Sequence, residues 1–443
     1  MIPITALATV PCMQVPALPD TRPSLSGPEL TVDSADGRFR VHYTEEGGDA
    51  PSGGDSDGDG LPDAVQQVLD GLALGVEVFE EKGYRELVPD TGAGGSEAID
   101  IYVRDINANG YAYALLGQGP EGGASCFMEV DGGLASTPGP LVESVVVHEL
   151  HHCVQYRYTT VTQTWMYEST ATYEQYIHVT DAALDLALGV LYAVRLGTPD
   201  LPIDETGDRY EYAGFLVMKF WEEFAGGDPD RVPALWERLA EEPDWEAAME
   251  AEALEQFDLD LGDSFLEHAT WNGFACARDD GGHYDAEVLG CAGLDITVPI
   301  EPFTDGFTAQ LELGPYTASY HEASADDDDR PVALTCTASE DTDARVKLVV
   351  LDADGNALEQ PGAAVGTEPV TLPTVGPTDP DGAILVVVAN VGHDPAEVDC
   401  TLDRTDLPQA PEGGCGCDNT GSLPMALALS PVVALLRRRS RTP

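Results

Sequence analysis

Basic residues are scarce in this sequence, and the paired cysteines of zinc ribbons are missing. Lys and Arg together number 21 among 443 residues, against 79 Asp and Glu, which gives a formal net charge of −58. A field of this sign repels nucleic acid and anionic membranes and attracts cations such as calcium. None of the nine cysteines belongs to a CxxC pair. These absences exclude nucleic acid as a partner and a ribbon-type structural zinc site.

The wide spacing of the cysteines instead indicates disulfide bonds, and therefore an oxidising compartment. The natural partners are cysteines that lie within one expected domain. On that basis we expect the pairs Cys276–Cys291 and Cys336–Cys400, with Cys126–Cys153 as a third candidate.

The two ends of the chain bear on where the protein goes. The first residues, MIPITALATVPC, contain no Lys or Arg and make a poor signal peptide. Near the other end, a Gly/Cys motif is followed by an apolar stretch, Leu423–Leu436, and by four arginines. This stretch is shorter than the roughly 20 residues of a stable membrane span, so a marginal C-terminal helix is one interpretation.

In its three-part order, the tail at residues 407–443 resembles the C-terminal sorting signals of myxobacterial surface proteins. The resemblance implies export, followed by processing and retention at the cell surface near Cys415 or Cys417. The terminal arginines would stay on the cytoplasmic side. We therefore expect an exported, surface-anchored protein whose tail engages the membrane or the sorting machinery.

Hydrophobic periodicity indicates a mixed N-terminal part. After a Pro-rich leader or linker at 1–28, apolar and polar residues alternate at 39–43 and predict a strand, and EAIDIYVRDI at 97–106 also predicts one. YAYALLGQG at 111–119 predicts an edge strand or a loop. Between the first two strands, apolar residues at helical spacing predict a helix. These residues are Val65, Val68, Leu69, Leu72 and Val76.

The pattern then changes twice. From about residue 139 to 280, amphipathic segments predict successive helices. After about 296, short β-rich runs separated by Gly, Pro and Asp turns are typical of a small β-sandwich. We therefore predict an α+β domain at 29–295, with a small mixed sheet and a helical subdomain, followed by an all-β sandwich domain at 296–406.

The stretch VVVHELHHCVQY, at 145–156, carries the strongest chemical signal. On a helix, His148 and His152 share one face and can bind one metal ion. Glu149, beside them, is placed to polarise a water molecule rather than to bind the metal. The alternative is a core helix with satisfied histidines, which the flanking valines would also suit.

Two further polar residues of this stretch have less direct roles. His151 is turned by about 100° from its neighbouring ligand histidine, so we interpret it as a polar bystander or as a residue that supports the ligands. Gln155 lies about two turns beyond His148 and can form a hydrogen bond near the site.

A third ligand would distinguish a metal site from a core helix. Glu168 lies sixteen residues beyond His152, in the stretch WMYESTATYEQY. This stretch resembles the W-x-x-E-G-x-A-x-[YF] pattern of gluzincin peptidases, with Ser169 in place of the usual glycine. The resemblance implies that Glu168 completes a His₂Glu zinc site in which one position stays open for water and substrate.

Two other residues on the same predicted helix, Glu174 and His178, are alternative third ligands. Glu174 lies six residues beyond Glu168, and that offset places it on a different helix face. We therefore favour Glu168 as the ligand and Glu174 as a carboxylate that supports the site.

A wider resemblance covers most of residues 37–230. FRVHYTEEG, DSDGDGLPD, a helix ending in KGY, the strand IDIYV and the HExxH helix followed by Gln155 occur in an order that is similar to a family of bacterial zincin metalloproteases. The resemblance implies a zincin catalytic domain and, with it, zinc-dependent peptide hydrolysis.

The acidic segment at 55–66 resembles an EF-hand loop. Gly60 stands at the turn, and Gln66 occupies the twelfth position in place of a bidentate glutamate, so the loop is closer to the short calcium repeats of extracellular proteins. We expect a structural calcium ion, and an acidic turn without metal is the alternative. The expected calcium ligands are Asp55, Asp57, Asp59 and Asp63.

Peptide hydrolysis also needs a donor for the developing oxyanion. In gluzincin aminopeptidases, a tyrosine just ahead of a small residue and a helix has this role. RYEYAGFLVMKF is similar and indicates Tyr212, with Tyr210 as the second candidate and a core aromatic as the alternative for both.

These expectations combine into one hypothesis and one rival. The hypothesis is an exported, surface-anchored zinc metallopeptidase that cleaves protein or peptide substrates, with Glu149 as the general base and calcium stiffening the N-terminal part. The rival is a calcium-stabilised adhesion or structural protein on a zincin scaffold without turnover. The presence of Glu149 argues against the rival, because a site without function would be free to lose that residue.

Overall fold

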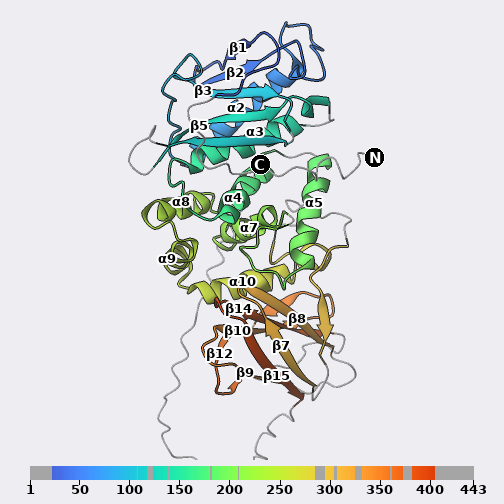
Figure 1. Ribbon diagram of the computed structural model, residues 1–443. Helices are drawn as coiled ribbons and strands as arrows, with labels where there is room; N and C mark the ends of the chain where they lie inside the picture. Colours follow the sequence, from blue (N-terminus) through green and yellow to red (C-terminus); the bar gives the residue numbers. More distant parts are fainter. Residues whose placement is uncertain are drawn as a thin grey trace, which may run out of the picture. The chain divides into compact units, whose positions relative to one another are not determined.

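A mixed sheet forms the N-terminal part of the protein (Figure 1). In this computed structural model, its strand order is β1-β2-β3-β5-β4. The inner pairings, β2 with β3 and β3 with β5, are parallel, whereas β1 and β4 at the two edges pair antiparallel with their neighbours. The strands are β1 (Leu30–Asp33), β2 (Phe39–Tyr43), β3 (Ile99–Arg104), β4 (Gly110–Leu115) and β5 (Ser125–Asp131).

A large part of the chain is described, with short gaps between the described ranges. Residues 1–21 of the predicted leader and the whole predicted tail at 407–443 lie outside it. Met1–Thr405 belongs to one compact unit and Asp406–Pro443 to another. Within the described ranges, no helix is long and apolar enough to cross a membrane. These ranges are 22–106, 108–116, 123–136, 140–179, 182–207, 209–284, 295–303, 307–324, 332–359, 362–372 and 382–404.

Two helices, α2 (Asp63–Glu81) and α3 (Leu141–Gln155), pack on the mixed sheet and on each other. α3 is buried along nearly its whole length, because it contacts the sheet, α2 and α4. The helix predicted by apolar spacing is therefore confirmed as α2. Of the apolar residues that predicted this helix, Val65, Val68, Leu72 and Val76 are buried.

Two glycines allow α2 to lie close to α3. A Cβ atom added to Gly71 would be 2.9 Å from Cβ of Val146, and one added to Gly75 would be 2.8 Å from Cδ2 of Leu150. Real Cβ contacts are essentially never that short. At Gly71 the contacts are with a Cβ atom and, at 3.0 Å, with Cα of Glu143, so the approach requires glycine there, whereas at Gly75 the end of the Leu150 side chain could shift. This close approach fixes the position of α3, which carries the HExxH motif.

The middle of the chain is helical, as predicted. These helices share one continuous buried cluster with the mixed sheet. Two short 3₁₀ turns, Leu134–Ser136 and Cys276–Arg278, accompany them. After α3, the helices are α4 (Thr164–His178), α5 (Ala182–Gly197), α6 (Tyr210–Ala213), α7 (Phe215–Phe224), α8 (Arg231–Glu241), α9 (Trp245–Phe257) and α10 (Leu261–Asn272).

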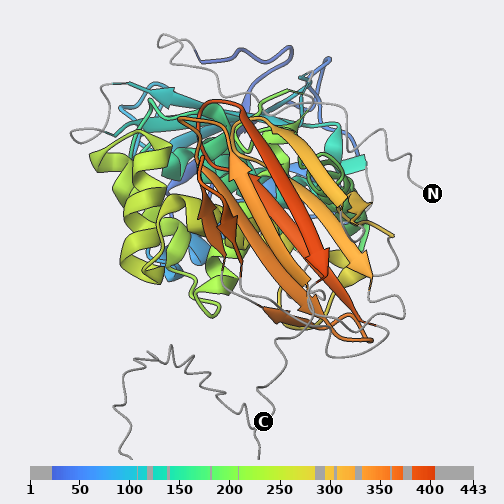
Figure 2. The same cartoon turned by 90° about the horizontal axis from the view of Figure 1, so that it is seen from below.

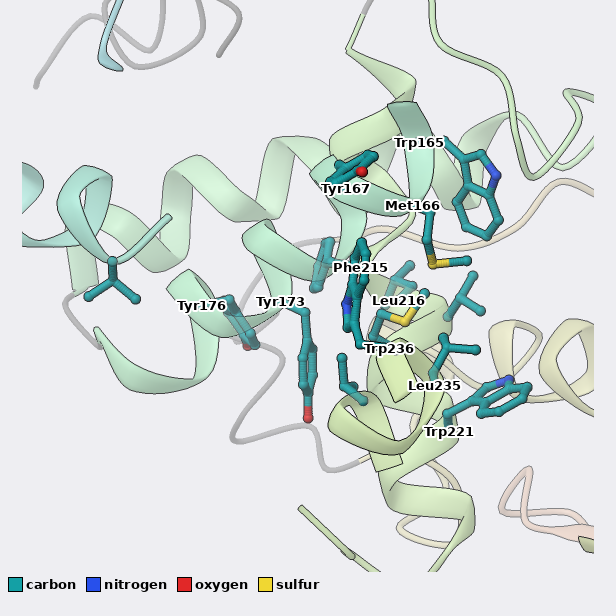
Figure 3. Packing of buried hydrophobic residues seen from close by; sticks show 14 of the residues in the cluster. Trp165, Met166, Tyr167, Tyr173, Tyr176, Phe215, Leu216, Trp221, Leu235 and Trp236 are labelled. Atoms are coloured by element: carbon teal, nitrogen blue, oxygen red, sulfur yellow. The ribbon is translucent and has the colours of Figure 1, made fainter. Parts of the chain in front are cut away.

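Aromatic side chains hold α4 against α7 and α8 (Figure 3). The rings of Tyr167 and Trp236 have their centroids 5.3 Å apart, and both residues are fully buried. The hydroxyl of Tyr167 donates to the backbone carbonyl of Thr159 at 2.8 Å. Each large apolar side chain buried in this way contributes about 1.5–3 kcal/mol. The position of α4, which carries Glu168, is therefore set by packing.

The C-terminal part is rich in β-strands, as predicted, and forms two sheets (Figure 2). Their strand orders are β11-β10-β14-β8-β6, with β12 also paired to β10, and β13-β9-β15-β7. Buried residues of both sheets share a single apolar cluster. The strands are β6 (Ile300–Pro302), β7 (Phe307–Leu313), β8 (Thr317–Ser324), β9 (Val332–Ala338), β10 (Ala344–Leu351), β11 (Ala357–Glu359), β12 (Ala363–Val365), β13 (Val370–Thr371), β14 (Ala383–Asn390) and β15 (Ala396–Arg404).

Strand β14 is buried along nearly its whole length, which explains its continuous apolar sequence AILVVVAN. Val386 belongs to the cluster between the two sheets, whereas Leu385 and Val387 belong to the cluster that includes α10. The hydroxyl of Tyr320 donates to the backbone carbonyl of Ala269 on α10 at 2.9 Å. The β-rich part and the helical part are therefore joined by a shared core.

Two of the expected disulfides are formed between described residues. Cys126–Cys153 joins β5 to α3, and Cys336–Cys400 joins β9 to β15. Cys276 is also disulfide-bonded, and its expected partner Cys291 lies outside the described residues. Disulfides of this kind form in oxidising compartments.

The bridge between Cys126 and Cys153 should stabilise the fold measurably. Replacing both cysteines with alanine is expected to lower the free energy of unfolding by about 2–4 kcal/mol, because the unfolded chain would gain conformational freedom. Urea unfolding of the wild type and the double variant, followed by circular dichroism, measures this difference. Equal midpoints and slopes for the two proteins would contradict a stabilising bridge.

Candidate metal centre

Three side chains of the kind that bind metals meet in the interior. His148 and His152 come from α3, and Glu168 comes from α4. Oε2 of Glu168 lies 3.2 Å from Nε2 of His148 and 3.5 Å from Nε2 of His152. One ligand atom of each residue lies within 4.8 Å of the others, and the three residues are at most 2% exposed. The predicted group is therefore brought together and could hold a metal ion.

Each histidine is held in the tautomer that a metal ligand needs. Nδ1 of His152 lies 2.7 Å from Oε1 of Gln155, and Nδ1 of His148 lies 3.1 Å from Oε1 of Gln175. Because an amide oxygen only accepts hydrogen bonds, Nδ1 must be the protonated nitrogen of each neutral ring. The lone pair of Nε2 is then directed toward the group, which is how supporting residues orient metal-binding histidines.

Of the two supporting amides, Gln155 was expected from the sequence and Gln175 was not. The side chain of Gln175 is itself anchored, because its Nε2 donates to Oγ of Ser144 at 2.7 Å. The signal was present in the sequence: Gln175 lies seven residues, or about two helical turns, beyond Glu168 and therefore on the same face of α4.

The charges of this group suit a divalent cation. Burial by itself lowers the pKa of His152, but the Glu168 carboxylate outweighs that effect and raises the pKa to about 9. Burial raises the pKa of Glu168, but the imidazoles of His152 and His148 lower it to about 2. At neutral pH the metal-free group is therefore an ion pair, and a metal ion that binds there displaces the proton of His152.

The group also leaves buried ligand atoms without hydrogen bonds. Among the described residues, Oε1 of Glu168 has no hydrogen-bond partner, and Nε2 of His152 has only the ion pair of 3.5 Å with Oε2 of Glu168. Buried polar atoms of this kind are costly, and a cation between them would satisfy both. The residues at this position therefore fit a bound metal ion with two nitrogen ligands and one oxygen ligand.

Glu149 is fully buried beside the ligands and lies against the edge strand β4. A Cβ atom added to Gly110, the first residue of β4, would be only 2.6 Å from Cγ of Glu149. Any other residue at position 110 would displace the glutamate or the strand. The side chain of the expected general base is thus placed between the ligand helix and the outer strand of the mixed sheet.

His151 is not one of the ligands. Burial lowers its pKa to about 3, so the ring is neutral at physiological pH. Its Nδ1 accepts a hydrogen bond of 2.8 Å from Nε2 of Gln155, and its ring contacts those of Phe79 and Tyr84. His151 therefore supports Gln155, which in turn supports His152.

Glu174 and His178 form a separate buried cluster and do not join the ligands. Glu174 accepts hydrogen bonds from Nζ of Lys82 at 3.0 Å and from the hydroxyl of Tyr84 at 2.6 Å, and it lies 3.0 Å from Nε2 of His178. Burial works against ionisation of Glu174, but Lys82 holds its pKa well below the usual range. Its hydrogen-bond partners among the described residues are Lys82, Tyr84 and His178 rather than the ligands, so any support that it gives the site is indirect.

The two candidate tyrosines have different surroundings. The hydroxyl of Tyr210 accepts a hydrogen bond from the guanidinium of Arg195 and donates one to the backbone carbonyl of Thr198 at 3.0 Å. The ring of Tyr212 lies 6.0 Å from the ring of His148, measured between centroids. Tyr212 is therefore the tyrosine that lies beside the ligands, and Tyr210 belongs to the packing around Arg195.

A second carboxylate near the ligands was missed by the sequence analysis. Glu211 lies between the two tyrosines on α6, and its Oε2 is buried without a hydrogen-bond partner among the described residues. Burial, the largest cause, and repulsion by the Glu168 carboxylate together raise its pKa to about 7. Nothing in the local sequence distinguishes this glutamate from the many others, so its environment could not be predicted.

The acidic loop at 55–63 brings three of its four predicted ligands together. The carboxylates of Asp55, Asp57 and Asp59 lie within 4.8 Å of one another and are exposed. Asp63 is used differently, because its Oδ1 accepts a hydrogen bond of 2.9 Å from the backbone N–H of Ser56. The three carboxylates form a group that could hold a cation at the start of α2.

The support that Gln155 gives His152 can be tested by metal binding. Replacing Gln155 with leucine should lower zinc affinity by roughly 10- to 100-fold, because His152 would lose the acceptor that fixes its tautomer. Competition with a chromogenic chelator measures the affinity. Gln66→Leu is the matched control, because Gln66 bonds to Asp70 on α2, outside the ligand group. An unchanged affinity in a folded Gln155→Leu protein would contradict this role.

Comparisons with known proteins add little to this picture. No family model matches the chain, and no curated protein matches it. Among solved structures, a mitogen derived from Yersinia pseudotuberculosis is similar over 25% of this chain and 95% of its own chain, with 8% sequence identity and a TM-score of 0.18. A similarity at this level carries no argument about fold or function.

Proposed function

We propose that this protein is a zinc-dependent metallopeptidase. The observation that carries the proposal is the buried group of His148, His152 and Glu168, with Glu149 beside it. Two imidazole nitrogens and one carboxylate oxygen form a ligand set typical of catalytic zinc, in which a further position stays open. Zinc bound there would supply Lewis acidity, which polarises a carbonyl and makes a water molecule more acidic.

The residues around the ligands suit the proton transfers of peptide hydrolysis. Glu149 is the proposed general base: it accepts a proton from the attacking water and delivers it to the leaving nitrogen. Its burial strengthens its electrostatic interactions with a polar substrate. Tyr212, beside His148, is the proposed donor to the developing oxyanion. Gln155 and Gln175 keep the histidines in the tautomer that this chemistry requires.

The neighbouring edge of the mixed sheet favours an extended peptide as substrate. β4 is the terminal strand in the order β1-β2-β3-β5-β4, and Glu149 lies against Gly110 at its start. The unpaired edge of a strand can form main-chain hydrogen bonds with an extended segment of another chain. Every residue of β4 except Tyr111 is buried, so a peptide that paired there would first have to displace the groups that cover the strand. Such a peptide would pass close to the proposed base.

The proposed setting is outside the cytoplasm. Disulfides at Cys126–Cys153 and Cys336–Cys400 support an oxidising compartment. The sequence of the tail at 407–443 adds the proposal of retention at the cell surface. The alternative function, a calcium-stabilised adhesion or structural protein without turnover, would be supported by the acidic loop but gives Glu149 no role.

Hydrolysis of casein with a paired measurement of zinc content tests the proposal. The wild type should bind one zinc ion per chain and cleave casein, and Glu149→Gln should keep the zinc while losing roughly 10²- to 10⁴-fold in rate. Glu168→Gln should lose zinc, whereas Glu174→Gln should keep it. A wild type that binds zinc but cleaves neither casein nor a peptide library would contradict the peptidase and favour the structural alternative.

The acidic loop gives a second, independent prediction. We propose that Asp55, Asp57 and Asp59 bind calcium, so that added calcium should raise the melting temperature of the wild type by several degrees through preferential binding to the folded state. The shift should disappear in Asp57→Asn. Asp352→Asn, in an exposed turn after β10, is the matched control and should retain it. The same melting temperature with calcium and with chelator would identify the loop as an acidic turn without metal.

A further inference from the structure

Glu211 borders the candidate metal centre. Its backbone carbonyl accepts a hydrogen bond of 2.8 Å from Oγ of Ser169, the residue that follows the ligand Glu168. The next residue on α6, Tyr212, places its ring 6.0 Å from the ring of His148. The short helix α6 therefore lies beside both ligand helices, and Glu211 is close to the place where a substrate would meet the metal.

The carboxylate of Glu211 lacks a countercharge. Its Oε2 has no hydrogen-bond partner, and no ion pair joins it to a Lys, Arg or His of the described residues. The nearby Glu168 and Glu205 carboxylates repel it, and Arg209 offsets this only weakly. The side chain is half-buried, so water solvates an ionised Glu211 only in part, and a cation that reached Oε2 would be attracted to it.

The pKa of Glu211 lies close to neutral pH, so both the protonated and the ionised carboxyl are populated there. Burial first, and then repulsion by the Glu168 carboxylate, raise its pKa to about 7. An approaching cation favours the ionised form of a carboxyl group. The buried Oε2 without a hydrogen-bond partner, rather than this pKa, makes Glu211 a candidate site for a cation.

We propose that Glu211 is a specificity-determining residue that binds a cationic group of the substrate, an ammonium or a guanidinium, next to the bond that is cleaved. The proposal rests on the peptidase function proposed above. A charge-assisted hydrogen bond to a buried carboxylate is stronger than one between neutral groups. The large negative charge of the chain, −58, would also attract cationic peptides to the protein.

Two parts of a peptide can supply this cation. One is the α-ammonium of a free N-terminus, which would make the enzyme prefer the ends of chains. The other is the side chain of Lys or Arg, which would allow cleavage within a chain. The shared chemistry is a hydrogen-bonding cation within reach of Glu211, and matched peptides distinguish the two sources.

The test compares the full-length wild type with Glu211→Gln on quenched fluorescent peptides. One series contains Lys or its neutral analogue norleucine at each position, and each peptide is made with a free and an acetylated N-terminus. We expect Glu211→Gln to raise KM for cationic peptides by roughly 10- to 100-fold, as expected for a lost hydrogen bond to a charged group. For neutral peptides, KM and kcat should stay within about twofold of the wild type.

Loss of the wild-type preference on acetylation would assign the cation to the N-terminus, and loss on replacing Lys would assign it to the side chain. Glu205→Gln is the matched control, because it also removes one negative charge near the site. The Glu205 carboxylate is already used within the fold, since its Oε1 accepts hydrogen bonds from the backbone N–H groups of Thr206 and Gly207. This variant should keep the preference. A wild type without preference, or an equal loss for cationic and neutral peptides in Glu211→Gln, would overturn the proposal.

A binding experiment separates this inference from the proposed function. Fluorescence anisotropy of the same labelled peptides is measured with Glu149→Gln and with Glu149→Gln/Glu211→Gln. If the wild type cleaves no peptide, the peptidase function fails, and selective binding of cationic peptides that depends on Glu211 would still support the cation site. Equal binding of cationic and neutral peptides by both variants would overturn it. Loss of zinc in Glu211→Gln would also overturn it, because Glu211 would then act on the metal.

Discussion

The candidate metal centre depends on one constraint: two imidazole rings and a carboxylate must be held together in the protein interior. Polar groups that are buried without partners cost free energy, so the outer nitrogen of each ring has its own acceptor. Gln155 and Gln175 supply these acceptors. Their amide nitrogens donate in turn to the backbone carbonyl of Tyr167 and to Oγ of Ser144. These hydrogen bonds connect the ligand orientation to the packing of α3 against α4, so the fold and the site cannot vary independently.

Close approaches of the backbone at glycines also help to hold the ligand side chains together. A Cβ atom at Gly110 would collide with Glu149, and one at Gly214 would lie 2.1 Å from Oγ of Ser169, next to the ligand Glu168. Gly71 plays a similar part where α2 crosses α3. At each of these positions, a side chain would push apart elements that carry or border the site. The glycines thus bring the mixed sheet, α2 and α6 close to the two ligand helices.

Much of the fold and the ligand group follows from local patterns in the sequence. Apolar alternation predicted β2, the stretch EAIDIYVRDI predicted β3, and helical spacing predicted α2. The i, i+4 histidines and Glu168 are brought together as expected. Long-range partners were not predictable. Lys82 and Tyr84, which bind Glu174, lie 92 and 90 residues from it in the sequence. A helical offset shows that Glu174 faces away from Glu168, but it cannot show which residues it meets there.

The scarcity of basic residues has a structural consequence. Lys82, Lys219 and Lys347 are at most 5% exposed, and each is paired with a carboxylate. These cations serve inside the fold, where an unpaired carboxylate would be costly. At the metal centre the carboxylates are not paired with Lys or Arg. Glu168 faces imidazoles, and Glu211 has no ion-pair partner among the described residues. In the metal-free group, protonated His152 supplies the positive charge that Glu168 favours, and a bound metal ion would take its place. For Glu211, we propose that the substrate supplies the positive charge.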